Sequence, residues 1–245
     1  WMASEDHDFE EINHIYLGGK RVEWKTDQKG PVGRILLKDS KQFKDQVRTL
    51  LKDDKRYSET LNQLDEIFEE SKTLAHAVRD FVYAAFSQLG LIVIDADQPE
   101  LKRLFAPHVK RELLESFSDR EVGKMDQLLI NSGFKTQVHS REVNLFWMEN
   151  GCRERIVKTA SGFETSDNQF SWTENELLQL LESNPENFSP NVILRPLYQE
   201  VILPNIAYIG GPGETSYWLQ LRGVFESAKV PMPVVLLRDM AFITN

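Results

Sequence analysis

The stretch that decides the fold is IAYIGGPGETSYWLQLRGVFESAKVPMPVVLLRD, residues 206–239. It opens with an apolar segment, IAYIGG, that we expect to be a buried strand, and it closes with a second one, MPVVLLRD. Between them, GETSYWLQLRGVFESA has the apolar spacing of a helix. A strand, a helical crossover and a second strand of this length predict parallel pairing, which is the unit of an α/β sheet.

The loop GGPGE follows the first of these strands. In parallel α/β sheets, ligands bind beyond the carboxyl ends of the strands, and the glycines Gly210, Gly211 and Gly213 would let a ligand approach the main chain. Glu214 suits an amino group or a hydroxyl better than a phosphate. The loop lacks both the G-x-G-x-x-G and the Walker patterns. The alternative is a tight turn in which Glu214 only favours the helix dipole.

Other candidate site residues lie on either side of this loop. The planar fork of Arg195 is a natural clamp for a carboxylate, although a structural ion pair is the commoner use of an isolated arginine. Tyr217 and Trp218 would form a wall of the site or simply pack. The remaining candidates for substrate binding are Tyr198, Gln199 and Asn205.

The segment SEDHDF, residues 4–9, is a second candidate site. If Glu5, Asp6, His7 and Asp8 are crowded and desolvated, some of them must have shifted pKa values or bind a cation or an ammonium group. A metal is disfavoured, because adjacent residues on an extended chain point in opposite directions. The alternative is a solvated acidic loop.

The first hundred residues alternate between strand and helix patterns. KRVEWKT (20–26) and GRILL (33–37) predict a β-hairpin, and residues 40–68 predict a pair of amphipathic helices. A helix from Leu74 should end at Gly90, directly before LIVID (91–95), which we expect to be a buried strand.

The middle of the chain predicts helices and a hairpin. Residues 98–117 should form a helix interrupted or kinked at Pro107, followed by a shorter helix through Leu129. Asn150-Gly151 predicts a type I′ hairpin turn. TENELLQLLES (173–183) has capping-box spacing, and SPNVILRPLYQEVILP (189–204) predicts a helix capped by Ser189, starting at Pro190 and bent or divided at Pro196.

Composition narrows the function. The 245 residues carry a formal net charge of -9 with interspersed signs, which disfavours nucleic acid as a partner. We find neither a run of about 20 apolar residues nor a signal peptide, so we expect a cytoplasmic protein. The single cysteine, Cys152, excludes an internal disulfide framework and a multi-cysteine zinc site. Because the chain opens at Trp1, we expect a piece of a longer protein.

Three segments carry a family resemblance: WMASEDHDFEEIN (1–13), GLIVIDADQPELKRLFAP (90–107) and SPNVILRPLYQEVILPNIAYIGGPGETSYWLQL (189–221). They closely resemble the bacillithiol biosynthesis cysteine-adding enzymes, a family of cysteine ligases. The resemblance extends from Trp1 to the final strand, and its last motif is long enough to be highly specific.

The resemblance implies an α/β fold with a Rossmann-like parallel-sheet core related to class I nucleotidyltransferases. It implies a core of residues 1–97 and 188–245, and a helical, hairpin-bearing connecting-peptide insertion of residues 98–187. It also implies that this chain lacks the family's N-terminal strand and its C-terminal coiled coil, through which the family would form a homodimer.

The implied reaction joins the carboxyl group of cysteine to the amine of glucosaminyl-malate, in the last step of bacillithiol biosynthesis. We expect ATP to activate the carboxyl group, and we leave any metal requirement open. Asp6, His7, Asp8 and Glu214 are the catalytic candidates, and Glu5 would help to bind substrate. Two alternatives remain: a related ligase acting on another amino acid and acceptor, or a non-catalytic scaffold of the thiol pathway.

Overall fold

The computed structural model of the chain describes residues 1–240. These residues form two compact units, which we describe separately. Unit 1 contains Trp1–Gln98 and the hairpin tip Met148–Arg153, and unit 2 contains Pro99–Trp147 and the chain from Glu154 onward. Among the described residues, no helix has the length and apolar character needed to cross a bilayer.

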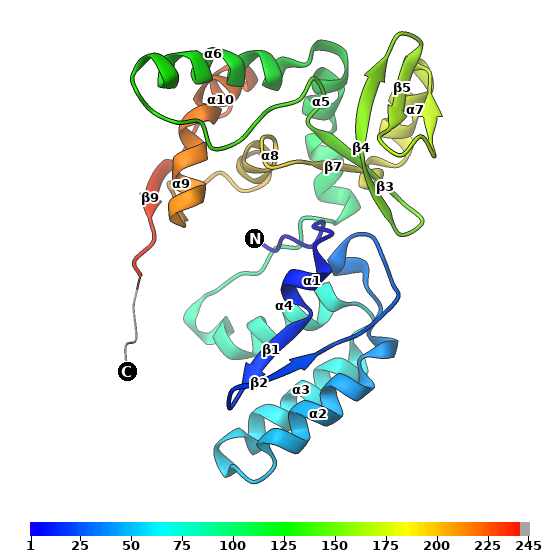
Figure 1. The fold of residues 1–245 in the computed structure, drawn as a ribbon, viewed down its shortest axis with the longest axis vertical. Coiled ribbons are helices and arrows are strands. Elements are labelled where there is room, and N and C mark those ends of the chain that lie inside the picture. Colours follow the sequence, from blue (N-terminus) through cyan, green and yellow to red (C-terminus); the bar gives the residue numbers. More distant parts are fainter. Residues whose placement is uncertain (241–245) are drawn as a thin grey trace. The chain divides into compact units, whose positions relative to one another are not determined.

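Unit 1 combines one small hairpin with helices (Figure 1). Its elements are α1 (Phe9–Ile12), β1 (His14–Leu17), β2 (Lys20–Glu23), α2 (Lys41–Leu51), α3 (Ser58–Glu70) and α4 (Leu74–Phe86). The predicted helix pair of residues 40–68 is confirmed as α2 and α3, and Gly90, with φ of 79°, ends the 3₁₀ turn that follows α4. Apolar side chains of these elements form the core around Trp24, Ile35 and Ala77.

Two predictions in unit 1 are wrong. The hairpin pairs β1 with β2 about Gly18-Gly19, whose positive φ angles make the turn, whereas residues 33–37 lie in 3₁₀ turns and their flanks. The segment 91–95 is not a buried strand. It forms a single parallel bridge from Asp95 to Met2, and the side chain of Ile92 is 78% exposed, because no neighbouring strand covers it within the described residues.

Unit 2 is built on helices and a sheet (Figure 1). Its helices are α5 (Pro99–Glu115), α6 (Phe117–Asn131), α7 (Glu174–Ser183), α8 (Arg195–Ile202), α9 (Pro212–Trp218) and α10 (Arg222–Ala228). The five-stranded sheet has the order β6-β5-β4-β3-β7. Its strands are β3 (Leu145–Glu149), β4 (Cys152–Thr159), β5 (Gly162–Thr165), β6 (Ser171–Trp172) and β7 (Phe188–Pro190).

Two local predictions in the middle of the chain are confirmed. Asn150 and Gly151 have φ angles of 51° and 75°, as a type I′ turn between β3 and β4 requires. Thr173 and Glu176 form the predicted capping box of α7. Turn and cap chemistry depends on neighbouring residues only, which is why the sequence predicts it well.

Two helix predictions differ in detail from the structure. The helix α5 runs through Pro107, so it is not interrupted there, and Phe105 and Val109 on either side are buried; a kink at Pro107 stays a prediction. Ser189 and Pro190 do not start a helix but belong to β7, where Pro190 pairs with Leu145 of β3. The helix α8 begins only at Arg195, with Pro196 in its first turn, where a missing N–H costs nothing.

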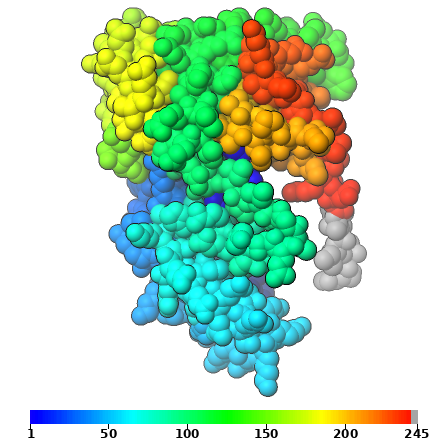
Figure 2. All heavy atoms as spheres, turned by 180° about the vertical axis from the view of Figure 1, so that it is seen from behind, coloured from blue at the N-terminus to red at the C-terminus, as the bar shows by residue number. Residues whose placement is uncertain are grey.

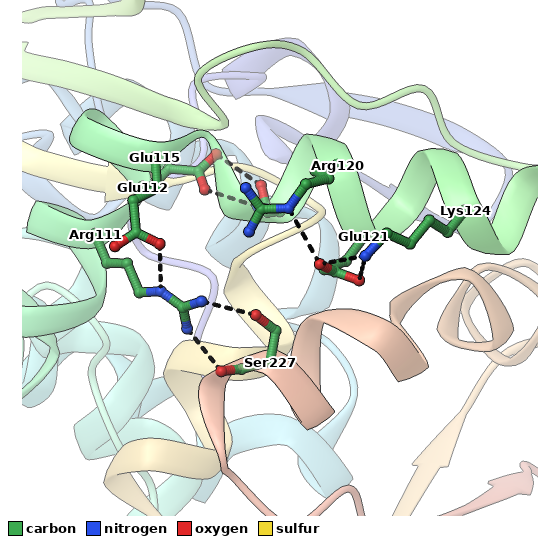
Figure 3. A network of polar contacts seen from close by, with 8 residues as sticks. Arg111, Glu112, Glu115, Arg120, Glu121, Lys124 and Ser227 are labelled. Carbon is green, nitrogen blue, oxygen red and sulfur yellow. Dashed lines mark hydrogen bonds and ion pairs between the residues drawn. The ribbon is translucent and has the colours of Figure 1, made fainter.

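Polar contacts hold three helices of unit 2 together (Figure 3). Arg111 of α5 donates to Glu115 over 2.9 Å and to the carbonyl oxygen of Ser227 on α10 over 2.6 Å. Glu112 is fully buried and accepts hydrogen bonds from the amide and the hydroxyl of Ser118 on α6. Burial raises the pKa of Glu112, although its hydrogen bonds from Ser118 and Asn144 oppose the shift.

The parallel crossover predicted for residues 206–239 is confirmed. Strands β8 (Ala207–Gly210) and β9 (Val234–Leu237) pair in parallel, with Gly210 opposite Leu237. The helix between them is divided into α9, a 3₁₀ turn and α10. The predicted burial is wrong: Ile209 and Val234 are 65% and 60% exposed, because this sheet has only two strands within the described residues.

The compact units do not follow the predicted domains. Contacts group the chain from Glu154 onward with residues 99–147, whereas we predicted a core of residues 1–97 and 188–245. Residues 241–245 of that predicted core lie outside the described residues. Because compact units reflect only the contacts within this chain, the domain division stays a prediction.

Candidate functional site

Glu214 is the centre of a polar cluster at the carboxyl end of β8. Its Oε1 accepts a hydrogen bond from the hydroxyl of Tyr208 over 2.7 Å, and its Oε2 accepts one from the amide of Gly211 over 3.2 Å. The side chain is 42% exposed. Glu214 therefore caps the start of its own helix, which agrees with the alternative of a tight turn in which it only favours the helix dipole. Its carboxylate is also partly exposed to solvent, where it can contact a ligand.

Arg195 supplies the cation of this cluster. Its Nη2 lies 3.5 Å from Oε1 of Glu214 and donates to the hydroxyl of Tyr217 over 2.8 Å. Its Nη1 donates to Gln199 over 3.4 Å. Burial alone would lower the pKa of Arg195, but the neighbouring hydroxyls of Tyr217 and Tyr208 outweigh burial and raise it. The arginine thus remains charged beside Glu214.

Tyr208 is a member of this cluster that the sequence analysis missed. Its ring stacks on Trp218 with centroids 4.3 Å apart, and this stack aims the hydroxyl at Glu214. Burial and the hydrogen bond to Glu214 raise the pKa of Tyr208 to about 12, so the phenol stays protonated and keeps donating. The sequence feature that could have indicated Tyr208 is its position in the predicted strand IAYIGG, six residues before Glu214.

The contact between Tyr208 and Glu214 explains why residue 210 is a glycine. A Cβ on Gly210 would lie 2.9 Å from Cε1 of Tyr208 and 3.2 Å from Cβ of Glu214. Only a residue without a side chain lets the tyrosine ring lie across the strand end and reach the glutamate. The first glycine of the loop therefore serves internal packing, and its contact with a ligand stays a prediction.

The other predicted binding residues of unit 2 have structural contacts. Tyr198 is fully buried with its ring centroid 4.9 Å from that of Phe105, and Trp218 is fully buried between Tyr208 and Phe225. The side-chain amide of Asn205 donates to Glu200, which also accepts from the amide of the Asn205 backbone, both over 2.8 Å. Their contact with substrate stays a prediction.

The acidic segment of unit 1 is held by main-chain hydrogen bonds. The amide of Val32 donates to the carbonyl oxygen of Asp6 over 2.6 Å, and that of Gly33 donates to the carbonyl oxygen of Ser4 over 2.8 Å. A Cβ on Gly33 would lie 2.5 Å from Cβ of Ser4, so the two segments touch directly. This attachment leaves the side chains of Asp6 and Asp8 more than half exposed.

A cation does accompany the acidic segment, and it comes from the protein. Arg153 of the hairpin tip lies with Nη1 2.9 Å from Nδ1 of His7. Burial lowers the pKa of Arg153, while the charges of Glu5, Asp6 and Asp8 oppose that shift. Three carboxylates therefore act on the guanidinium group of Arg153. The sequence could not indicate Arg153, because 146 residues separate it from His7.

The predicted site residues therefore fall into two groups. Glu5, Asp6, His7 and Asp8 belong to unit 1 with Arg153, and the residues around Glu214 belong to unit 2. Each group has its own internal geometry. That both line one active site stays a prediction.

A parallel β–α–β crossover with a glycine-rich loop at the carboxyl end of its first strand is typical of Rossmann-like domains. The chain belongs to the family described as "Bacillithiol biosynthesis BshC, N-terminal Rossmann-like domain", which it matches over residues 1–239. The resemblance found in the sequence is thereby confirmed.

Named relatives agree with this family. A "Putative cysteine ligase BshC" of Flavobacterium psychrophilum is 42% identical over 249 residues, covering 100% of this chain and 46% of the relative. Relatives of the same name from Flavobacterium johnsoniae and Staphylococcus haemolyticus are 39% and 31% identical, with 100% and 97% of this chain and 46% and 47% of the relative covered. The chain thus spans about half the length of these curated relatives.

Proposed function

We propose that this chain is part of a cysteine ligase that adds L-cysteine to glucosaminyl-malate in the last step of bacillithiol biosynthesis. The observation that carries the proposal is the match to the family over residues 1–239, together with relatives named as cysteine ligases. The new bond would be an amide between the cysteine carboxyl group and the amine of the acceptor.

The reaction needs an activated carboxyl group, since a carboxylate is a poor electrophile at neutral pH. ATP would supply the activation as an adenylate or an acyl phosphate. The acceptor amine then attacks the carbonyl carbon, the C–N bond forms, the bond to the phosphate oxygen breaks, and the amine loses a proton to a base. The phosphate product leaves with the bonding electron pair.

The two polar groups support complementary roles in this reaction. The charges of Glu5, Asp6 and Asp8 favour an ammonium group, and Asp8 would take the proton from the attacking amine, with His7 beside it assisting the transfer. Glu214 would bind an amino group or a hydroxyl through its exposed oxygens. Arg195 would meet a substrate carboxylate, with Gln199 and Tyr217 at its side.

Several features of the whole protein belong to the same proposal. We propose a core related to class I nucleotidyltransferases with residues 98–187 as its connecting-peptide insertion. We also propose that the full-length protein has a further N-terminal strand, and a C-terminal coiled coil through which it forms a homodimer. ATP, cysteine and glucosaminyl-malate are small polar molecules, so we place the enzyme in the cytoplasm.

The test is product formation by the purified full-length protein. It is incubated with cysteine, glucosaminyl-malate and ATP, and the products are identified by mass spectrometry, with and without added divalent metal. Bacillithiol that forms only with ATP supports the proposal. Competition between cysteine and other amino acids in the same assay tests the alternative of a ligase that acts on another amino acid. Absence of any product, with loss of cellular bacillithiol when the gene is deleted, would favour the scaffold instead.

A further inference from the structure

The fold does not require glycine at two positions of the loop. Gly211 has φ of −69° and ψ of 171°, which any residue adopts, and a Cβ there would meet nothing closer than 3.7 Å. A Cβ on Gly213, in the first turn of α9, would meet no atom of the described residues within 4 Å, apart from its chain neighbours and the backbone of its own helix. Glycine inside a helix is less stable than alanine, so packing does not account for Gly213.

The atom 3.7 Å from that position on Gly211 is Nη2 of Arg238. Arg238 follows β9 directly, and its amide donates to the carbonyl oxygen of Gly210 over 2.8 Å, which extends the parallel ladder. The two strands thus end side by side, with a guanidinium group next to the bare backbone of the loop. Figure 2 shows the end of β9 at the molecular surface, in red.

No carboxylate within residues 1–240 pairs with Arg238. The side chain is exposed, and among residues 1–240 neither Arg238 nor the following Asp239 forms an ion pair. Within the described residues the cation that pairs with Glu214 is Arg195, not Arg238. An exposed, unpaired guanidinium beside open backbone is suited to an anionic oxygen.

We infer that Arg238, with Gly211 and Gly213, binds an anionic group of a substrate at the carboxyl end of the β8–β9 pair. The shared chemistry is a phosphate or carboxylate oxygen that Arg238 holds through its forked donors while the ligand lies against the glycine backbone. The amide of Gly211 is occupied by Glu214, so Arg238 is the main donor. This inference adds a binding residue to the proposed ligase. It rests on the proposed function only in the choice of the ligands that are tested.

The test measures binding to the full-length protein by calorimetry, with three probes used separately: ATP with magnesium, L-cysteine and glucosaminyl-malate. Arg238→Gln should weaken one of them about tenfold. A loss confined to ATP identifies a phosphate, and a loss confined to cysteine or glucosaminyl-malate identifies a carboxylate. Arg222→Gln is the matched control, since Arg222 is an exposed arginine of α10 that pairs with Glu226.

A second pair of variants tests the open backbone. Gly211→Ala and Gly213→Ala should leave the thermal midpoint unchanged or higher, yet weaken the same ligand several-fold, because the added methyl group occupies its space. Unchanged affinity for all three probes in Arg238→Gln would overturn the inference, whether or not product forms. Weakened binding in a protein that makes no bacillithiol would instead retain the inference and reject the proposed function.

Discussion

Nη1 of Arg153 lies 2.9 Å from Nδ1 of His7. A guanidinium group can only donate hydrogen bonds, so Nδ1 of His7 is the acceptor in this contact. Nε2 lies 4.0 Å from Oδ1 of Asp8. Arg153 thereby fixes the orientation of the histidine and partly offsets the charge of the acidic segment.

Replacement of Arg153 should disturb this segment. Arg153→Met removes a positive charge near Glu5, which is only 6% exposed, and near its acidic neighbours. We expect the free energy of unfolding to fall by about 1–2 kcal/mol, between the values for exposed and buried ion pairs. The loss should be larger at low ionic strength, where screening is weaker.

The measurement is chemical denaturation of the full-length protein at two salt concentrations. Arg155→Met, at an exposed position two residues along β4, is the matched control and should change stability little. Equal effects of the two substitutions would show that the charge of Arg153 does not matter to the acidic segment.

Glu214→Gln should affect activity far more than stability. Glutamine keeps the size of the side chain and an oxygen that can accept from Tyr208, but it loses the charge that would bind an amine. We expect product formation to fall by about tenfold to a hundredfold, with a stability change below about 1 kcal/mol. Glu226→Gln on α10, which is also exposed and also paired with an arginine, is the control for both assays. Full activity in a folded Glu214→Gln variant would remove this residue from the site.

Gly210→Ala should be destabilising, unlike the other glycine substitutions in this loop. The new methyl group would lie within 3.2 Å of both Tyr208 and Glu214, so the tyrosine must move. We expect a loss of about 1–3 kcal/mol, as for other overpacked sites. Tyr208→Phe removes only the hydroxyl and should cost less, about 1 kcal/mol. Denaturation curves compare the two, and a neutral Gly210→Ala would contradict the packing explanation.

Glu112 should make stability depend on pH. Burial raises its pKa in the folded protein above the ordinary value of 4.5, so the folded state binds more protons than the unfolded state between the two pKa values. Stability from this group is therefore fully present below about pH 4.5 and is lost as the pH rises through the folded pKa. Glu112→Gln cannot titrate and lacks this dependence.

The measured quantity is the free energy of unfolding of the full-length protein minus that of Glu112→Gln, from about pH 4 to pH 8. We expect this difference to fall with rising pH, by no more than about 1.4 kcal/mol per pH unit, and then to level off. A difference that rises with pH would mean that the hydrogen bonds from Ser118 and Asn144 outweigh the burial of the carboxylate.

The sequence by itself determined the features that depend on neighbouring residues. The parallel crossover of residues 206–239, the Asn150-Gly151 turn and the Thr173–Glu176 capping box all follow from local patterns of apolar spacing and backbone preference. The family could also be identified from the sequence, because the motifs that carry the resemblance are contiguous segments. Local chemistry needs no knowledge of distant partners.

Only the tertiary structure decided which distant residues meet. An apolar run such as LIVID has no neighbouring strand to cover it among the described residues, so its burial could not be predicted from its letters. Arg153 reaches His7, 146 residues away in the sequence, through chain folding that no local pattern encodes. Hydrogen bonds and charges act over a few ångströms in space, whereas the sequence orders residues only along the chain.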